Sequence, residues 1–418
     1  MPCVVSFGSD ERVDLDVPAE AMVAVCDEPL GEALADPAAA VEVVLGDPLN
    51  FPPLARAIVP GDRIVLALEH GVPQAATLVA AVAGYLVRQG VSPDHLVVLQ
   101  ARAAVAECDS RQLLPDDWRD DVTLEIHAPE TPGKLSLLGS SHEGKPVYLN
   151  RTLLDADLVV PIGCLRDEAS IGYHGRYGGL FPAFADSKAQ QRYRKPAAPR
   201  TARETLATQR EEIDEIGWLL GTQFTVQALP GGGGRLLRVL AGDIPEVFRA
   251  GLSAYGAAWR CSVPRRASLV VASLTGDPEQ QTWENVGRAL ASASRVLAEG
   301  GAIALCTQLA AEPGPAVASL LQVDDLEATR KRIRREAAAD ALPATELVRA
   351  LERGKVYLLS RLEETLVEDL GMAPMTEPED VERLARRHES CIVLANAQHV
   401  VPSVEAEEGE ENVSNAGA

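Results

Sequence analysis

Residues 63–100 read RIVLALEHGVPQAATLVAAVAGYLVRQGVSPDHLVVLQ, and this stretch decides the fold class. Residues 63–68 end in an apolar run with the length and composition of a buried parallel strand. Residues 75–89 then predict a helix, which ends before Gly90, a residue type favoured just after a helix C-terminus. A second apolar run follows at 95–100. Strand, helix and strand in this order predict a βαβ unit with a right-handed crossover.

The same pattern continues on both sides of this unit. A half-buried edge strand is expected at 13–17, and further short strands are expected at residues 122–127, 147–150, 158–162, 268–273, 302–306, 356–360 and 391–395. A chain of 418 residues exceeds one ordinary core. We therefore predict two α/β domains with mostly parallel sheets, at residues 1–256 and 257–402, with an interdomain cleft between them. Residues 403–418 are acidic and poor in apolar side chains, which predicts a disordered tail.

Composition and charge exclude several classes of function. The 39 basic and 61 acidic residues give a net charge of −22, which would repel a phosphate backbone, so no nucleic-acid partner is expected. No apolar run approaches the roughly 18 residues of a membrane span, so no membrane partner is expected. The first residues carry acids where a secretory signal has a basic region, which favours a cytoplasmic location.

The cysteines indicate reduced thiols and no disulfide framework, because their number is odd and they form no C-x-x-C pair. They are Cys3, Cys26, Cys108, Cys164, Cys261, Cys306 and Cys391. The seven histidines likewise show no metal-binding spacing, so no local motif names a metal. Any functional site must be assembled from distant positions.

Two loops after predicted strands are candidates for that site, because ligands bind outside the carboxyl ends of parallel strands. Glu69 and His70 follow the strand at 63–68. Residues 163–179 read GCLRDEASIGYHGRYGG, in which Arg176 could pair with an anion and His174 could act as a general base. Both loops could also be purely structural.

Three other segments favour simpler interpretations. Residues 231–234 are four glycines, but no G-K-[ST] follows, so a hairpin turn is preferred to a phosphate loop. The basic run at 331–335 is typical of a solvated helix face. Residues 185–210 are polar and could form a lid or merely cross the surface. A dinucleotide-dependent dehydrogenase is disfavoured because no G-x-G-x-x-G follows a strand.

Several ordered pieces of the chain carry a family resemblance. They are DPLNFPPL at 47–54, PGD at 60–62, GKPVYLNR at 144–151, DADLVVPIG at 155–163, GYHG at 172–175 with Pro182, GDP at 276–278 and GG at 300–301. In these pieces the chain resembles the nickel-pincer lactate racemases and related 2-hydroxyacid racemases and epimerases. The resemblance implies a two-domain α/β fold with the site in the cleft. It also implies a nickel pincer nucleotide held by a lysine thioamide and a nickel-binding histidine, with two further histidines as acid and base.

The residues that carry this chemistry in the family are mostly replaced. The resemblance places the cofactor lysine at Gly178, one catalytic histidine at Glu168 and the nickel-binding histidine at Arg194. A glycine cannot form the covalent link, and Lys188 is the only lysine nearby in sequence. The cofactor is therefore unknown, since the expected nickel pincer nucleotide is not supported by Gly178 and Arg194.

Other family positions are partly preserved. The family's acid-threonine-arginine-proline turn becomes EHGVP at 69–73, and its glycine-threonine-histidine turn falls near 102–104, which read RAA. The expected glutamine and lysine of the second domain become Asn285 and Arg288, which keep an amide and a cation.

These substitutions leave two functions open. The first is a racemase- or epimerase-like isomerase with an altered site in the interdomain cleft. Its catalytic residues would be His174, His70 and Glu168, and its substrate-binding residues Arg176, Tyr173, Asn285 and Arg288. The second is a noncatalytic protein that binds a small anionic metabolite or nucleotide in the same cleft. In both cases we expect His70, Arg176, Arg194 and Arg288 to converge and favour anions.

Overall fold

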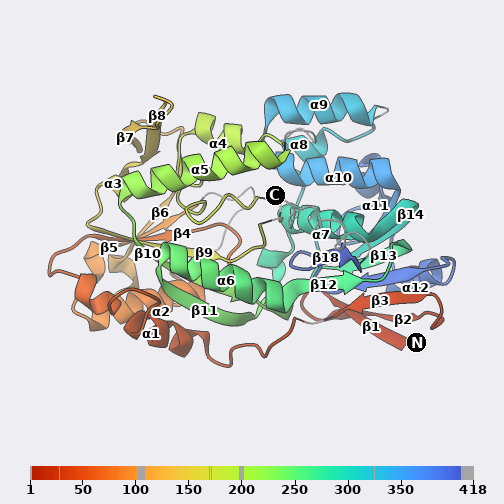
Figure 1. Ribbon diagram of the computed structural model, residues 1–418, viewed down its shortest axis with the longest axis horizontal. Helices are drawn as coiled ribbons and strands as arrows, with labels where there is room; N and C mark the ends of the chain where they lie inside the picture. Colours follow the sequence, from red (N-terminus) through yellow and green to blue (C-terminus); the bar gives the residue numbers. More distant parts are fainter. Residues whose placement is uncertain are drawn as a thin grey trace, which may run out of the picture.

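The computed structural model describes residues 2–27, 29–101, 109–168, 170, 172–196, 202–323 and 325–405. Two six-stranded sheets dominate this part of the chain, with strand orders β11-β10-β9-β4-β5-β6 and β16-β15-β14-β13-β17-β3. They lie side by side, with helices on their faces (Figure 1). The predicted α/β class with mostly parallel sheets is confirmed.

The first sheet contains the predicted βαβ unit. Its strands are β4 (Ile64–Leu68), β5 (Leu96–Gln100), β6 (Thr123–Ile126), β9 (Leu158–Cys164), β10 (Phe224–Pro230) and β11 (Leu236–Asp243). All neighbours are parallel except β10 and β11, which form an antiparallel hairpin. Every residue of β4 is buried because its alternate side chains enter the apolar clusters on opposite faces of the sheet. The glycines at 231–234 form the turn of the hairpin, as predicted.

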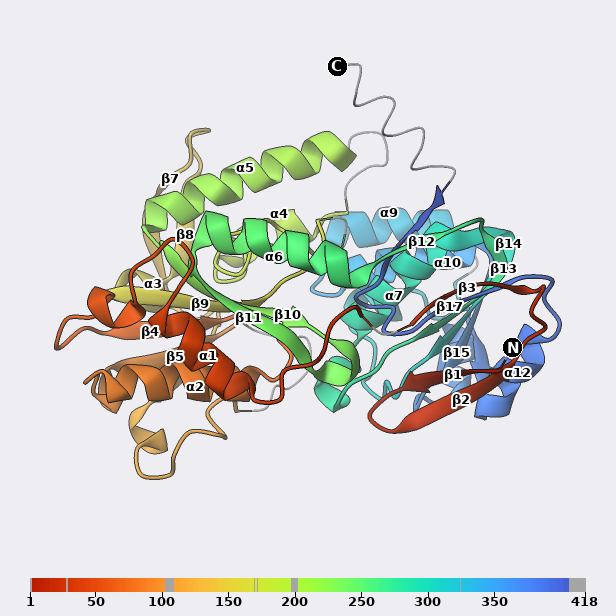
Figure 2. The ribbon, with the colours of Figure 1, turned by 60° about the horizontal axis from the view of Figure 1, so that its bottom comes forward.

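Helices cover both faces of the first sheet. On one face lie α1 (Pro37–Gly46) and α2 (Ala75–Arg88), and on the other lies the short α3 (Arg151–Leu154). A two-stranded sheet of β7 (Leu135–Ser140) and β8 (Pro146–Asn150) packs with α4 (Ser187–Arg194) and α5 (Ala202–Leu220). Figure 2 shows α5 on the side opposite α1 and α2. The polar stretch predicted at 185–210 thus contains α4 and the start of α5.

The second sheet is assembled from both ends of the chain. Its strands are β3 (Met22–Cys26), β13 (Ala267–Ser273), β14 (Leu297–Cys306), β15 (Lys355–Leu359), β16 (Ala373–Met375) and β17 (Cys391–Leu394). Because β3 pairs in parallel with β17, residues 22–26 belong with this sheet and not with the other strands predicted within 1–256. We call residues 37–243 the first half, and residues 2–26 with 260–404 the second half.

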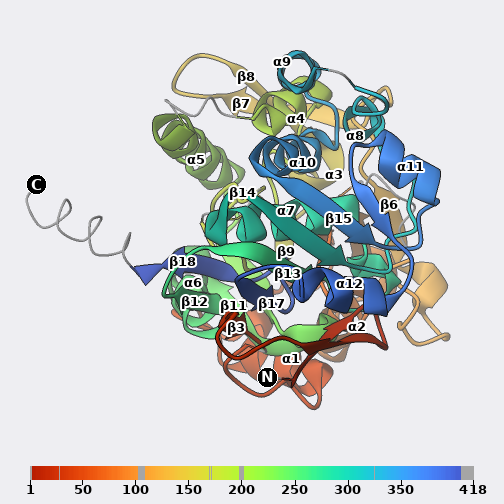
Figure 3. The same cartoon turned by 90° about the vertical axis from the view of Figure 1, so that its right-hand side faces the viewer.

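The two faces of the second sheet are covered differently. The helices α7 (Trp283–Val296) and α10 (Ala341–Arg353) pack on one face together with α6 (Ile244–Trp259), which connects the halves. The hairpin of β1 (Pro2–Phe7) and β2 (Glu11–Asp16), which contains most of the predicted strand at 13–17, packs on the other face with α12 (Pro378–Ala385). Figure 3 shows α10 and the amino-terminal hairpin on opposite sides.

The remaining segments lie at the periphery. They are α8 (Pro315–Ala318), α9 (Leu326–Glu336), α11 (Glu364–Asp369), β12 (Arg260–Val263) and β18 (Val401–Val404). Lys331 is exposed on α9 and pairs with Glu327 at 2.8 Å, which confirms a solvated helix face. The tail was predicted to start at 403, but β18 extends to Val404 by pairing with β12, and residues 406–418 lie outside the described part. None of the described helices is both long and apolar enough to span a membrane.

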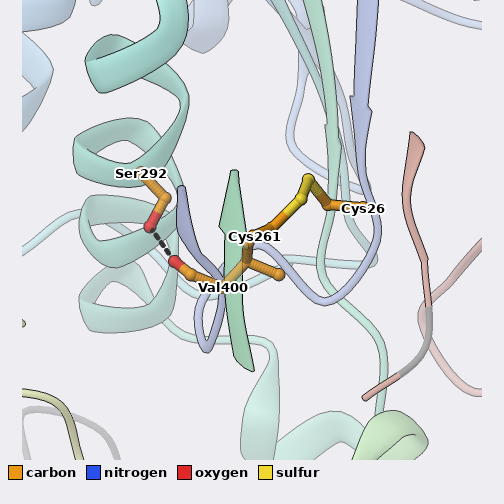
Figure 4. The surroundings of a disulfide bond; sticks show 4 residues. All are labelled: Cys26, Cys261, Ser292 and Val400. Atoms are coloured by element: carbon orange, nitrogen blue, oxygen red, sulfur yellow. Dashed lines mark hydrogen bonds between the residues drawn. A yellow bond between two sulfur atoms is a disulfide. The ribbon is translucent and has the colours of Figure 1, made fainter. Parts of the chain in front are cut away.

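One prediction about the cysteines is wrong. Cys26, at the end of β3, and Cys261, in β12, form a disulfide with their Cα atoms 6.1 Å apart (Figure 4). The two residues are 235 positions apart, so only the tertiary fold brings them together. Cys3, Cys164, Cys306 and Cys391 are free thiols, and Cys108 lies outside the described residues. Nearby, the Ser292 hydroxyl on α7 donates to the Val400 carbonyl at 2.8 Å, which fixes the chain just before β18.

Candidate functional site

The carboxyl ends of β4 and β9 place polar side chains at one edge of the first sheet. Glu69 and His70 follow β4, and Arg166 follows β9, the parallel neighbour of β4. The Cys164 amide donates to Glu69 Oε2 at 3.3 Å, and Arg166 Nη2 donates to the His70 carbonyl at 3.5 Å. The sequence argument that placed His70 at a strand end is therefore correct.

The helix α7 of the second half supplies two more charged side chains, one acidic and one basic. Thr282 caps this helix by accepting from the Asn285 amide at 3.2 Å, and Glu284 and Arg288 follow one turn apart. Glu284 Oε2 lies 3.1 Å from His70 Nε2 and 3.6 Å from Arg288 Nη2. We name Glu69, His70, Arg166, Glu284 and Arg288 the cross-half cluster, because its members come from both halves.

The cross-half cluster contains a buried arginine with spare hydrogen-bonding capacity. The Arg288 side chain is only 11% exposed, and its Nη1 donates to Asn285 Oδ1 at 2.7 Å. Its Nε is buried without a hydrogen-bond partner among the described residues, as is Gln227 Oε1. Burial, followed by the like charge of Arg166, lowers the pKa of Arg288 to about 10. A bound anion would relieve both effects, because it would neutralise the repulsion and accept from Nε.

Glu284 remains ionised in this setting. Burial opposes its charge, but the nearby His70, through its charge and hydrogen bond, and then Arg288 hold the pKa of the Glu284 carboxyl well below its ordinary value. The carboxylate therefore pairs with His70 and offsets part of the charge of Arg288. The arrangement places an acid–base pair beside a buried guanidinium.

A cavity of about 610 Å³ lies against the cross-half cluster. Glu69 and His70 form part of its wall, together with Gln100 at the end of β5. Residues 278–282 and 308–311 contribute the side that belongs to the second half. The cavity therefore lies at the carboxyl ends of strands from both sheets, where ligands of parallel α/β folds bind.

His174 and Tyr173 lie in the glycine-rich loop but do not line this cavity. His174 packs edge-on against the Tyr193 ring, with the centroids 5.9 Å apart, and lines a separate space of only about 40 Å³. Burial, then the charges of Arg210 and Arg194, lower the pKa of His174 to about 4, so its imidazole is neutral. Tyr173 stacks under Arg210 at 5.0 Å, and burial raises its pKa to about 12.

Glu168 and Arg176 lie on the outer side of the same loop. The Glu168 side chain is 62% exposed, and its carbonyl accepts from Arg210 Nη2 at 2.7 Å. Arg176 donates from Nε and Nη2 to Asp214 Oδ2 on α5, at 3.0 and 2.6 Å. The structure thus brings His70, Asn285 and Arg288 together, and it pairs Arg176 in the loop with Asp214 on α5. The roles of His174, Tyr173, Glu168 and Arg176 stay predictions.

The glycine-rich loop still passes close to the cluster. A Cβ built on Gly172 would lie 3.9 Å from Arg288 Nη2, and Arg166 in the same loop is only 7% exposed. Sequence reasoning missed Arg166 and Glu284 as site residues. Glu284 could have been found, because it precedes Arg288 by four positions, a spacing that places both side chains on one face of a helix such as α7.

Comparisons with known proteins agree with this fold. Residues 8–198 match the family described as the lactate racemase N-terminal domain. This segment of the chain belongs to that family. The predicted resemblance to lactate racemases is thereby confirmed for the part of the chain that carries His70 and Arg166.

Solved structures extend the similarity in fold to most of the chain. The lactate racemase apoprotein from Thermoanaerobacterium thermosaccharolyticum is 16% identical, with a TM-score of 0.78, over 96% of this chain and 100% of that one. A Thermotoga maritima protein is 13% identical, with a TM-score of 0.64, over 89% of this chain and 99% of that one. No curated protein matches the chain in sequence.

The residues present do not fit the lysine-linked nickel cofactor of lactate racemases. A Cβ at Gly178 would lie 3.0 Å from His174 Cβ and 3.1 Å from the Gly175 carbonyl oxygen, so a lysine there would need the loop to shift. Arg194 donates to Gln190 Oε1 at 3.0 Å and offers no neutral nitrogen ligand. Within the described residues no three His, Cys, Asp or Glu side chains are grouped to hold a metal.

Proposed function

We propose that this protein binds a small 2-hydroxy acid at the cross-half cluster and acts as a racemase- or epimerase-like protein with an altered site in the cleft between its halves. The observation that carries the proposal is Arg288, a buried guanidinium whose Nε has no partner among the described residues. The lactate racemase N-terminal domain and the racemase fold support the same substrate class.

The substrate carboxylate would accept hydrogen bonds from Arg288, with the charge of Arg166 adding to the attraction. Charge-assisted pairs of this kind are planar and can be bidentate, so they also orient the acid. Racemisation inverts C2, so the C2–H bond must break and re-form. His70 and Glu284 form the acid–base pair beside the arginines, and they are suited to hold and return a proton.

A noncatalytic binding protein is the second candidate. It is favoured by Gly178 and Arg194, which stand where the family resemblance places the cofactor lysine and the nickel ligand. In this case the anion site would be retained without turnover. The two candidates differ in a single measurable property, namely whether the bound acid changes its stereochemistry.

Calorimetry with D- and L-lactate and D- and L-2-hydroxybutyrate tests the proposal. We expect Arg288→Gln to weaken binding about 10- to 100-fold, as expected for loss of one charge-assisted contact of about 1.5–3 kcal/mol. Arg176→Gln is the matched control, because Arg176 is held by Asp214 and does not belong to the cross-half cluster. Chiral chromatography of each enantiomer after incubation separates the candidates: binding without interconversion supports the noncatalytic one. Absence of binding, or equal losses in both variants, would overturn the proposal.

A further inference from the structure

The chain passes between the two halves through two connections, and the disulfide ties their second-half ends together. The first connection, residues 27–36, leaves the second half directly after Cys26 at the end of β3. The second connection is α6, which leads into β12 and Cys261. Both cysteines therefore belong to the second half, and the whole of the first half lies within the loop that the bond closes.

The disulfide links two separate sheets of the second half. The helix α6 packs on β10 and β11 of the first half, and Trp259 Nε1 in its last turn donates to the Pro230 carbonyl of β10 at 2.9 Å. Beyond α6, β12 pairs with β18 in a two-stranded sheet, whereas β3 is the edge strand of the six-stranded sheet. The bond from Cys261 to Cys26 thus joins the small sheet covalently to the large one (Figure 4).

Hydrogen bonds also hold the chain just before β18. The Ser292 hydroxyl donates to the Val400 carbonyl at 2.8 Å, and the Tyr255 hydroxyl donates to the His399 carbonyl at 2.7 Å. Hydrogen bonds open transiently in native proteins, whereas a disulfide stays closed until it is reduced. The state of the disulfide should therefore decide how firmly the end of α6 is attached to the large sheet.

We propose that the Cys26–Cys261 disulfide is a redox-sensitive hinge clamp that controls how readily the two halves separate. While the bond is intact, the second-half ends of both connections stay together, so the halves turn about one fixed hinge. After reduction, α6 and the small sheet can shift relative to β3, and the contacts between the halves open more often. This inference goes beyond the proposed function and does not depend on what the cleft binds.

A dithiol is the reductant that this switch requires. Cys261 is half-buried, whereas Cys26 is only 6% exposed, so a thiolate of the dithiol attacks Cys261 Sγ. The bond between the two cysteines breaks, and Cys26 leaves as a thiolate that takes up a proton from solvent. The second thiol of the dithiol then displaces Cys261 Sγ and closes the dithiol's own disulfide. The dithiol supplies both electrons, and the two cysteines end as free thiols.

Two backbone amides report on the motion of the hinge. The Leu30 amide in the first connection donates to the Ala258 carbonyl of the second at 3.2 Å. The Gly233 amide, in the turn between β10 and β11, donates across the halves to Thr275 Oγ1 at 2.9 Å. Both amides should become less protected when the halves separate.

Hydrogen–deuterium exchange followed by mass spectrometry tests the proposal on segments 29–34 and 231–235. The samples are the oxidised protein, the same protein reduced with dithiothreitol, and the double variant Cys26→Ser with Cys261→Ser. Thiol alkylation of the folded protein checks that the bond has been reduced. We expect both segments to exchange about tenfold faster in the reduced protein and in the variant, at labelling times at which β4 and β13 remain protected.

The controls separate the hinge from overall stability. Cys3→Ser should exchange like the unmodified protein, and dithiothreitol should have no effect on the double variant. If the two segments exchange faster only when β4 and β13 do so as well, the bond acts through global stability and the clamp is wrong. The clamp is also wrong if neither segment changes, if the folded protein resists reduction, or if the reduced protein is unfolded by circular dichroism. An unfolded double variant leaves the decision to the reduced unmodified protein.

Discussion

The two halves of the molecule differ in how the chain builds them, and the contacts they make are of two kinds. The first half is one continuous stretch of chain, whereas the second is assembled from both ends, with the Cys26–Cys261 disulfide near the points where the chain leaves and re-enters it. We call a contact such as this disulfide closed, meaning that each of its groups has a bonding partner. The cross-half cluster, in contrast, joins the two halves, and it leaves Arg288 Nε without a partner among the described residues. We therefore expect the closed contacts to serve stability and the incomplete cluster to serve the proposed binding.

The largest expected effect is on the disulfide. Cys261→Ser should lower the free energy of unfolding by about 2–5 kcal/mol, because the bond closes a long loop and so restricts the unfolded chain. Urea denaturation under non-reducing conditions measures it. Cys3→Ser, at a free thiol, is the control. An unmodified protein whose midpoint is the same with and without dithiothreitol would show that the bond does not stabilise the fold.

A smaller loss of stability is expected from a closed contact inside the first half. The buried Tyr193 hydroxyl donates to Glu212 Oε2 at 2.7 Å, and Arg192 Nη2 donates to Glu212 Oε1 at 2.7 Å. Tyr193→Phe should cost about 1.5–3 kcal/mol, the usual range for a hydrogen bond to a charged group. Tyr148→Phe, at a 40% exposed ring, should cost much less. Hydroxy-acid affinity should not change in either variant. If Tyr193→Phe does change this affinity, closed contacts also take part in binding and our distinction between the two kinds of contact is wrong.

The stability should also fall in mild acid because of a buried histidine. Burial, then the charges of Arg166 and Arg288, lower the pKa of His399 to about 3, so the native state keeps this imidazole neutral. The unfolded chain takes up a proton below about pH 6.5, so stability decreases as the pH falls from 6.5 towards 3. Between about pH 6.5 and 5 the loss should be about 1–2 kcal/mol.

His399→Gln should flatten this part of the pH dependence, measured as urea midpoints at several pH values. His142→Gln is the control with the opposite sign. The hydrogen bond and charge of Glu215 raise the pKa of His142, so removing this 65% exposed imidazole should leave the slope at least as steep. A His399→Gln variant with an unchanged slope would show that another group causes the acid sensitivity.

The sequence predicted features that depend on neighbouring residues, and it missed features that depend on contacts between distant segments of the chain. The strands β4 and β5 and the helix α2 were predictable because their apolar patterns are complete within a few residues. His70 and Arg288 were predicted to converge because each stands at a recognisable position, one after a strand and one in a family motif, and the structure brings both into the cross-half cluster. Arg166 and the disulfide partners were missed, since their neighbours are distant in sequence. The strand β3 was missed for the same reason: its pairing with β17 joins residues 22–26 to residues 391–394.

The smallest effect is expected at Arg176, which the sequence predicted as a substrate-binding residue. Its side chain is 42% exposed and its partner Asp214 is 30% exposed, so the pair should contribute only about 0.2–1 kcal/mol to stability. Arg176→Gln and Asp214→Asn should each cost that little, and their double variant should cost less than the sum, since both remove one pair.

Neither single variant should change hydroxy-acid affinity, because Arg176 and Asp214 pair with each other and neither belongs to the cross-half cluster. This outcome separates the two arginines on physical grounds. Arg176 donates from Nε and Nη2 to one carboxylate, whereas Arg288 keeps a buried donor without a partner among the described residues. If Arg176→Gln instead weakens binding as much as Arg288→Gln, the ion pair with Asp214 must open to admit the ligand. The glycine-rich loop would then belong to the binding site, as the sequence suggested, and the distinction between closed and incomplete contacts would be wrong.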